Sequence, residues 1–94
     1  MKLFKSIDKK FEDIGFVKCK ENEYGVTYER NNNTYNYTQR LDLIHKSNGS
    51  HIVQSYDTHL MDGDMTGNTC VGLTMYEIKL CLKKMKEMGW KIKK

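Results

Sequence analysis

Residues 73–90, LTMYEIKLCLKKMKEMGW, constrain the fold most strongly, because this stretch contains signals for both ends of a helix. Thr74 and Glu77 have the spacing of a capping box, in which each side chain bonds the backbone amide of the other residue. Gly89 stands where a left-handed residue ends a helix, and Trp90 follows it to fold back on the last turn. We therefore expect a helix that begins after Thr74 and ends before Gly89.

The spacing of its apolar residues predicts which face of this helix is buried. At about 100° per residue, six of them fall in one sector that we expect to pack on the core: Met75, Ile78, Cys81, Leu82, Met85 and Met88. Tyr76 and Leu80 lie outside the sector, beside Lys83. Either these residues are exposed and contact a partner or a second copy of the chain, or a helix packed alongside covers them.

A second helix and four strands are expected in the remaining chain. Apolar residues at helical spacing predict a helix over residues 2–14, which ends at Gly15 as the other helix ends at Gly89. Alternating patterns predict strands at 16–20, 24–30, 35–45 and 51–57, the last two joined by an Asn48-Gly49 turn. The order α-β-β-β-β-α predicts an α+β two-layer sandwich in one domain of residues 1–94. Its four-stranded antiparallel meander carries the N- and C-terminal helices on one face.

Charge is distributed unevenly along the chain. The net charge is +4, with basic ends and an acidic middle. Lysines near the C-terminus could solvate the outer face of the helix or bind nucleic acid. The candidates for nucleic-acid contacts are Lys79, Lys83, Lys84, Lys86, Lys91 and Lys93.

Five tyrosines fall on the expected strands: Tyr24, Tyr28, Tyr35, Tyr37 and Tyr56. They would either pack beneath the helices or project from the open face of the sheet as platforms for a base or a protein. The pattern favours packing, since tyrosine is a common sheet residue and the middle of the chain is acidic.

Residues 58–72 lack periodicity and form a long connection, of a length that is often functional. Within it, Asp62, Asp64 and Thr66 occupy the first, third and fifth positions of a calcium loop, but Leu73 stands where the final bidentate acid is needed. His45 and His51, with His59 and Cys70 nearby in sequence, are an alternative donor set for zinc. We expect the loop to be solvated and the histidines to lie on the surface, so no cofactor is predicted.

Recognisable catalytic patterns are missing from the sequence. It has no local nucleophile–base arrangement and no phosphate-binding glycine loop, so we expect the protein not to be an enzyme. Its three cysteines form no C-x-x-C pair, and no apolar run has the length of a membrane span. These features predict a cytoplasmic protein that does not enter a membrane.

The run FEDIGFVKCKENEYGVTYER, followed by YNYTQRLDLIHK, resembles small uncharacterised proteins encoded by phages and prophages of low-GC Gram-positive bacteria. The resemblance covers most of the chain but rests on composition and element order, and it transfers no functional residue. It implies an accessory protein of a mobile element. The expected function is binding to an as yet unknown protein partner, with a homodimer as one form, through Tyr76, Leu80 and Lys83 first and the 58–72 loop second. Binding of nucleic acid is the alternative.

Overall fold

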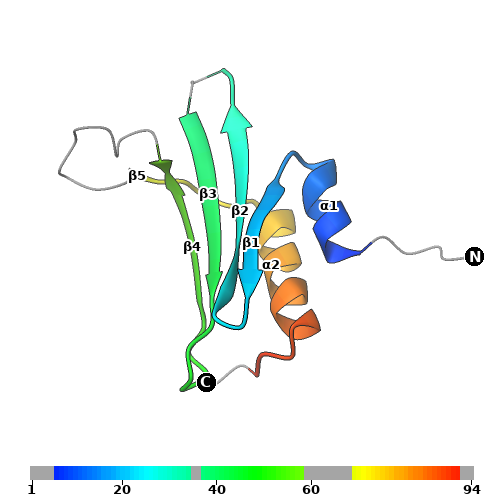
Figure 1. Ribbon diagram of the computed structural model, residues 1–94. Coiled ribbons are helices and arrows are strands. Elements are labelled where there is room, and N and C mark those ends of the chain that lie inside the picture. The colour runs from blue at the N-terminus through cyan, green and yellow to red at the C-terminus, as the bar shows by residue number, and fades with distance from the viewer. Residues whose placement is uncertain (1–5, 35–36, 59–68, 92–94) are drawn as a thin grey trace, which may run out of the picture.

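The computed structural model describes residues 6–34, 37–58 and 69–91, which form two helices and one antiparallel sheet (Figure 1). The strands lie in chain order, each beside the next. The elements are α1 (Ile7–Asp13), β1 (Val17–Asn22), β2 (Gly25–Asn32), β3 (Tyr37–Ile44), β4 (Ile52–Asp57), β5 (Thr69–Cys70) and α2 (Met75–Glu87).

The predicted α+β meander between two terminal helices is confirmed, with changes at the element ends. The predicted start of the first helix at residue 2 is wrong, because Ser6 caps the helix by accepting a hydrogen bond from the Lys9 amide. A short strand, β5, lies in the stretch that was expected to be an aperiodic loop and pairs with the end of β4. Because β5 has only two residues, its sequence has no alternating pattern from which a strand could be predicted.

Both helices end as the sequence predicts. Gly15 and Gly89 have φ of 97° and 81°, in the left-handed region that favours glycine. The next residue then folds back: the Phe16 amide donates to the Phe11 carbonyl over 2.9 Å, and the Trp90 amide donates to the Met85 carbonyl over 3.0 Å.

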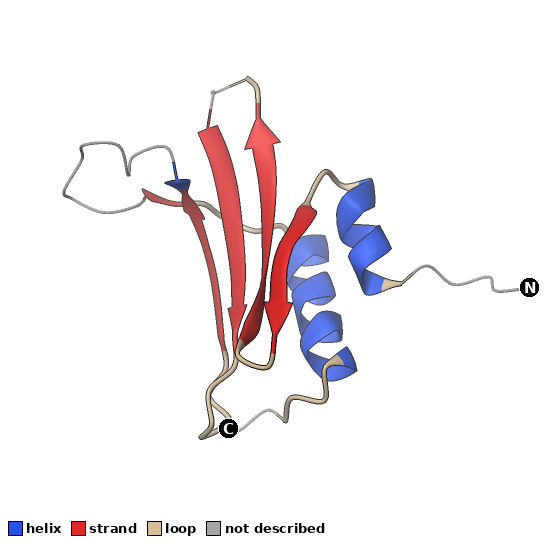
Figure 2. Ribbon diagram, in the orientation of Figure 1, coloured by secondary structure: helices blue, strands red, loops and turns tan. Residues whose placement is uncertain are grey.

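The core lies between one face of the sheet and the helices (Figure 2). Alternate residues of β2 and β3 point into it, and α1 contributes a phenylalanine that stacks on the ring of Tyr28 with centroids 4.2 Å apart. The buried apolar residues are Phe11, Phe16, Val26, Tyr28, Leu41, Leu43, Leu80, Cys81 and Met85.

Helix α2 is rotated relative to the expected orientation. Cys81 and Met85 are buried as predicted, but the placement of Met75, Ile78 and Leu82 in the core is wrong, since they are 88%, 45% and 49% exposed. The other buried positions of the helix are Glu77, Leu80 and Lys84. At about 100° per residue, the buried face is centred roughly 80° from the apolar sector. Two of the buried residues carry charge, so a hydrophobic pattern alone could not locate this face.

Candidate functional site

Two charged residues of α2, Glu77 and Lys84, are buried and bind residues of other elements; we call them the anchors of α2. The carboxylate of Glu77, the first anchor, makes one contact with each of its oxygens. One oxygen completes the predicted capping box by accepting from the Thr74 amide, while the Thr74 hydroxyl accepts from the Glu77 amide. The other oxygen lies 2.9 Å from the Arg30 guanidinium on β2. Because this carboxylate is almost fully buried, the cap and the ion pair together fix the start of α2 on the sheet.

Arg30 is held in place from several sides. Its guanidinium donates to the Ile14 carbonyl over 3.0 Å and to the Gln39 side chain over 2.8 Å, and it lies 4.2 Å from the centroid of the Phe16 ring. An Arg held this way loses little further freedom when it pairs with Glu77. The guanidinium therefore joins α1, β2, β3 and α2 at one point.

The second residue that ties α2 to the rest of the fold is Lys84. It lies two turns after Glu77 on the same buried face of the helix. Its buried ammonium lies 3.0 Å from Glu21 on β1 and 3.2 Å from Asp8 on α1. Lys18 pairs with the same two carboxylates, at 3.0 Å and 2.8 Å, and the Tyr28 hydroxyl donates to Asp8 over 2.6 Å. Alternating charges thus tie α2 to both α1 and the sheet.

These contacts shift the pKa values of the groups that make them. Partial burial alone would raise the pKa of Asp8, but hydrogen bonds from Lys18, Tyr28 and Lys84 outweigh it and lower the pKa to about 2. Burial would lower the pKa of Lys84, but its bonds to Glu21 and Asp8 outweigh that effect and raise it. The network is therefore charged near neutral pH.

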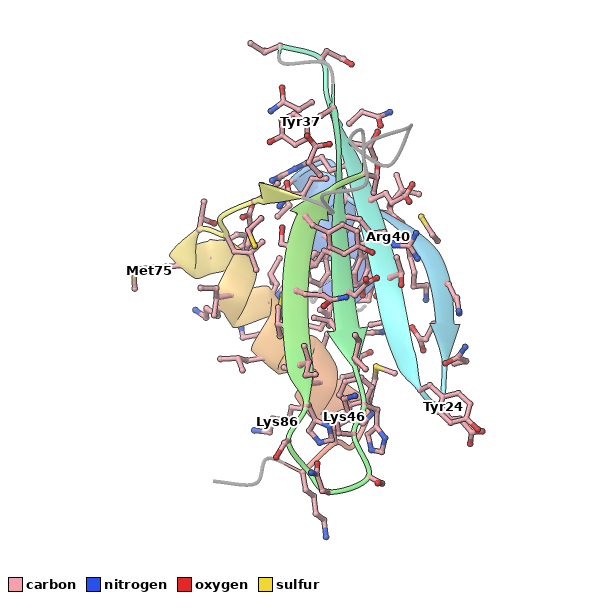
Figure 3. The ribbon with its side chains drawn as sticks, turned by 90° about the vertical axis from the view of Figure 1, so that its left-hand side faces the viewer. Tyr24, Tyr37, Arg40, Lys46, Met75 and Lys86 are labelled. Atoms are coloured by element: carbon pink, nitrogen blue, oxygen red, sulfur yellow. The ribbon has the colours of Figure 1, made fainter. Side chains whose placement is uncertain are left out.

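With both anchors facing inward, an apolar line of α2 faces outward. We call Met75, Ile78 and Leu82 the α2 stripe; their i, i+3 and i+7 spacing places them along one side of the helix. In Figure 3, which looks onto the β4 edge, Met75 extends from α2 away from the sheet. At its C-terminal end the stripe leads into a hollow of about 340 Å³ lined by Leu82, Lys83, Met85, Lys86 and Trp90.

Exposed lysines border the stripe on its solvent side. We call Lys79, Lys83 and Lys86 the lysine row. Within the described part of the chain, no carboxylate pairs with any of these ammonium groups. The exposed acid on α2 is Glu87, which lies 3.9 Å from Lys84. The outer surface of the helix therefore combines apolar and positively charged side chains.

The residues expected to contact a protein partner are placed differently from one another. Tyr76 is 50% exposed and Lys83 is exposed, but the expectation that Leu80 is a surface contact is wrong, since Leu80 is 1% exposed in the core. The sequence had left open that a neighbouring helix covers Leu80, and α1 does pack beside α2. Reasoning from sequence missed the α2 stripe, because it assigned those residues to the core.

The lysines expected to contact nucleic acid are also divided. Lys79, Lys83, Lys86 and Lys91 are exposed, but Lys84 is buried in its ion pairs and is wrong as a phosphate ligand. Lys93 lies outside the described residues, as do Asp62, Asp64 and Thr66, the residues proposed for calcium.

The open face of the sheet carries a self-contained polar cluster. Asp42 accepts hydrogen bonds from Thr27 at 2.7 Å, Tyr56 at 2.8 Å and Gln54 at 3.2 Å, and Arg40 lies 3.4 Å away. Burial alone would raise the pKa of Asp42, but these donors outweigh it and lower it. Because its acceptor positions are occupied, Asp42 is arranged as a structural carboxylate and not as a base.

The tyrosines divide between the two faces. Tyr28 packs beneath the helices as the pattern favoured, and Tyr37 lies half-buried on the same side of β3 as the core residues. Tyr56 lies on the open face, bonded to Asp42. Tyr24 is exposed at the end of β1 and β2, where Figure 3 shows it pointing outward; Tyr35 lies outside the described residues. These positions form no continuous aromatic platform.

His45 and His51 do come together, but against Trp90. The two imidazoles stack with centroids 4.8 Å apart, and each lies 5.1 Å from the indole. The His51 Nδ1 accepts from the Lys46 amide at 3.1 Å, and its Nε2 lies 2.8 Å from the Lys91 carbonyl. Since both nitrogens are used by the backbone, His51 is not poised to bind zinc.

No family model, curated protein or solved structure matches this chain. Among the described residues, no three His, Cys, Asp or Glu side chains gather as a metal site would require, and no helix has the length and apolarity needed to cross a membrane. The candidate site is therefore defined by geometry alone, as the α2 stripe with its lysine row.

Proposed function

We propose that this chain is a non-enzymatic accessory protein that binds another protein through the α2 stripe. The observation that carries the proposal is the exposure of Met75, Ile78 and Leu82 on a helix whose rotation is fixed by buried ion pairs. Such a face is preformed, so binding requires little ordering of the helix. The resemblance to small phage-encoded proteins is in keeping with an accessory role in a mobile element.

Energetics support the view that the stripe is held outward. Turning α2 to bury Ile78 and Leu82 would gain about 1 kcal/mol for each half-exposed side chain. The same rotation would pull Glu77 and Lys84 from their partners, and breaking a buried pair costs about 3–5 kcal/mol. The ion pairs therefore outweigh the apolar gain, and the helix keeps apolar side chains available to a partner.

The docking face continues from α2 toward the sheet. Val53 on β4 pairs with the buried Leu43, so it lies on the helix-facing side of the sheet, yet it is 38% exposed. The ion pairs of α2 reach Glu21 on β1 and Arg30 on β2, and Val53 on β4 is left partly exposed on the same side of the sheet. Figures 1 and 3 show α2 beside this face of the sheet. A partner seated on the stripe could also cover Val53, and the combined patch is of the kind that marks interaction sites.

Affinity capture from the host cell, with matched variants as bait, tests the proposal. Ile78→Gln with Leu82→Gln removes apolar contacts from the stripe, whereas Val17→Gln with Tyr24→Gln removes exposed apolar side chains from other places. We expect a partner that the wild type and the control variant retain but the stripe variant loses. Equal retention by all three, with circular dichroism showing all three folded, would refute the proposed site.

Nucleic-acid binding is a second candidate because the lysine row has no carboxylate partners among the described residues. A gel shift with a duplex and a single-stranded oligonucleotide at low and high salt tests it. Phosphate contacts predict a shift that disappears steeply with added salt. Absence of a shift at low salt removes this function.

A further inference from the structure

We infer that the α2 stripe takes an acidic amphipathic helix of a partner protein. This inference rests on the proposed function and adds the chemistry of the occupant. The stripe residues Met75, Ile78 and Leu82 follow one side of α2, and such a ridge packs against the corresponding groove of another helix. The hollow beside Leu82 and Trp90 would receive an apolar side chain at one end of the contact.

Charge at the border of the stripe selects the partner. Lys79, Lys83 and Lys86 are exposed beside it, and Glu87, the exposed acid of α2, is already close to Lys84. Carboxylates on an incoming helix would meet three ammonium groups that lack partners among the described residues. Lysines at the same positions would be repelled, so the border discriminates by charge.

The same charges disfavour a second copy of this chain on the stripe. Two α2 helices packed face to face would bring one lysine row against the other, and Glu87, the exposed acid of α2, already lies close to Lys84. Addition of an extended segment to the β4 edge is also disfavoured, because strand addition needs a free sheet edge. The edge of β4 is partly occupied by β5 and by the Val71 amide, which donates to the Ser55 carbonyl over 3.0 Å.

Two synthetic peptides test the inference by NMR on the isotope-labelled protein. Both are amphipathic helices with leucines at the spacing of the stripe; one carries glutamates on its remaining face, and the other carries lysines there. We expect the glutamate peptide to shift the amides of Ile78, Leu82 and Lys86, with an affinity at least about ten-fold above that of the lysine peptide. The difference should narrow as salt is added.

A charge-reversed protein is the matched control. Lys79→Glu, Lys83→Glu and Lys86→Glu together change exposed side chains only, so the fold should persist, and we expect this variant to prefer the lysine peptide. If Lys84→Glu were used instead, unfolding would obscure the result, since Lys84 is buried.

Several outcomes would overturn the inference, and they separate it from the proposed function. Equal binding of both peptides, lost in Leu82→Gln, would leave the stripe as a docking face but refute an acidic partner. A concentration-dependent dimer lost in Leu82→Gln would make the occupant a second copy. Shifts at the lysine row with an oligonucleotide and none with either peptide would favour nucleic acid. If neither peptide binds, an amphipathic helix is refuted as the occupant of the α2 stripe. The capture experiment independently decides the proposed function.

Discussion

Glu77 of α2 and Arg30 of β2 form an ion pair of 2.9 Å in which the carboxylate is almost completely buried. The same carboxylate caps α2 through the Thr74 amide. A single side chain therefore sets where the helix starts and, together with Lys84, which way the helix faces. This relationship explains why the most apolar line of α2 is left outside.

Replacing Glu77 should be more damaging than losing a helix cap. Glu77→Ala removes the bond to Thr74 and leaves Arg30 without its carboxylate partner, so we expect a loss of about 3–4 kcal/mol in the free energy of unfolding. Thr74→Ala removes only cap hydrogen bonding and should cost about 1 kcal/mol. Urea unfolding of both variants measures the difference. Equal losses would mean that the ion pair contributes nothing.

Lys84 and Lys83 are adjacent in sequence but differ in role. Lys84→Met takes one of two ammonium partners from Asp8 and Glu21, and we expect it to destabilise the fold by about 2–3 kcal/mol. Lys83→Met changes an exposed residue and should stay within about 0.5 kcal/mol of the wild type. Thermal unfolding of the pair checks this, and a reversed order would contradict the buried network.

Low pH should destabilise the fold over a pH range that is set by the pKa of Asp8. Its pKa falls from 3.8 unfolded to about 2 folded, so its contribution is complete above about pH 4 and is lost as the pH falls through 2. The corresponding loss is about 2 kcal/mol, and Glu21, whose pKa is also lowered, acts in the same direction. Urea unfolding as a function of pH measures it. In Asp8→Asn, the free energy of unfolding should depend less steeply on pH between about 2 and 4. An unchanged dependence would mean that other groups cause the loss of stability in acid.

His51 should hold the segment after α2, at Trp90 and Lys91, against the β3–β4 turn. It bonds the Lys46 amide and the Lys91 carbonyl and stacks beside Trp90, so His51→Ala removes both backbone contacts. We expect a loss of about 1–2 kcal/mol and a red shift of the emission of the single tryptophan as it becomes more hydrated. His45→Ala, which leaves these two hydrogen bonds intact, is the comparison. Unchanged emission in His51→Ala would show that the ring does not position Trp90.

Local sequence signals predicted the elements well because they act over a few residues. The capping box at Thr74, the left-handed glycines at 15 and 89, and the alternation of β2 and β3 each depend on neighbouring positions. The two-layer order of the fold follows from those elements. The edge strand β5 was not predicted, because its two residues are a strand only through their pairing with β4 and have no sequence pattern of their own.

The orientation of α2 could not be predicted by the same means. Amphipathic analysis places charged residues outside, but Glu77 and Lys84 are buried because Arg30, Asp8 and Glu21 from distant elements neutralise them. The spacing of Glu77, Leu80, Cys81 and Lys84 is helical, so a signal was present. Choosing it over the apolar sector required partners that only the fold brings together.

Leu80 and Leu82 provide the most direct test of this account. They are the same residue type two positions apart, but Leu80 is 1% exposed and Leu82 is 49% exposed. By urea unfolding we expect Leu80→Gln to cost more than about 3 kcal/mol and Leu82→Gln no more than about 1 kcal/mol. The apolar pattern of the sequence predicts the opposite order. A larger loss for Leu82→Gln than for Leu80→Gln would place the stripe in the core and remove the proposed docking face.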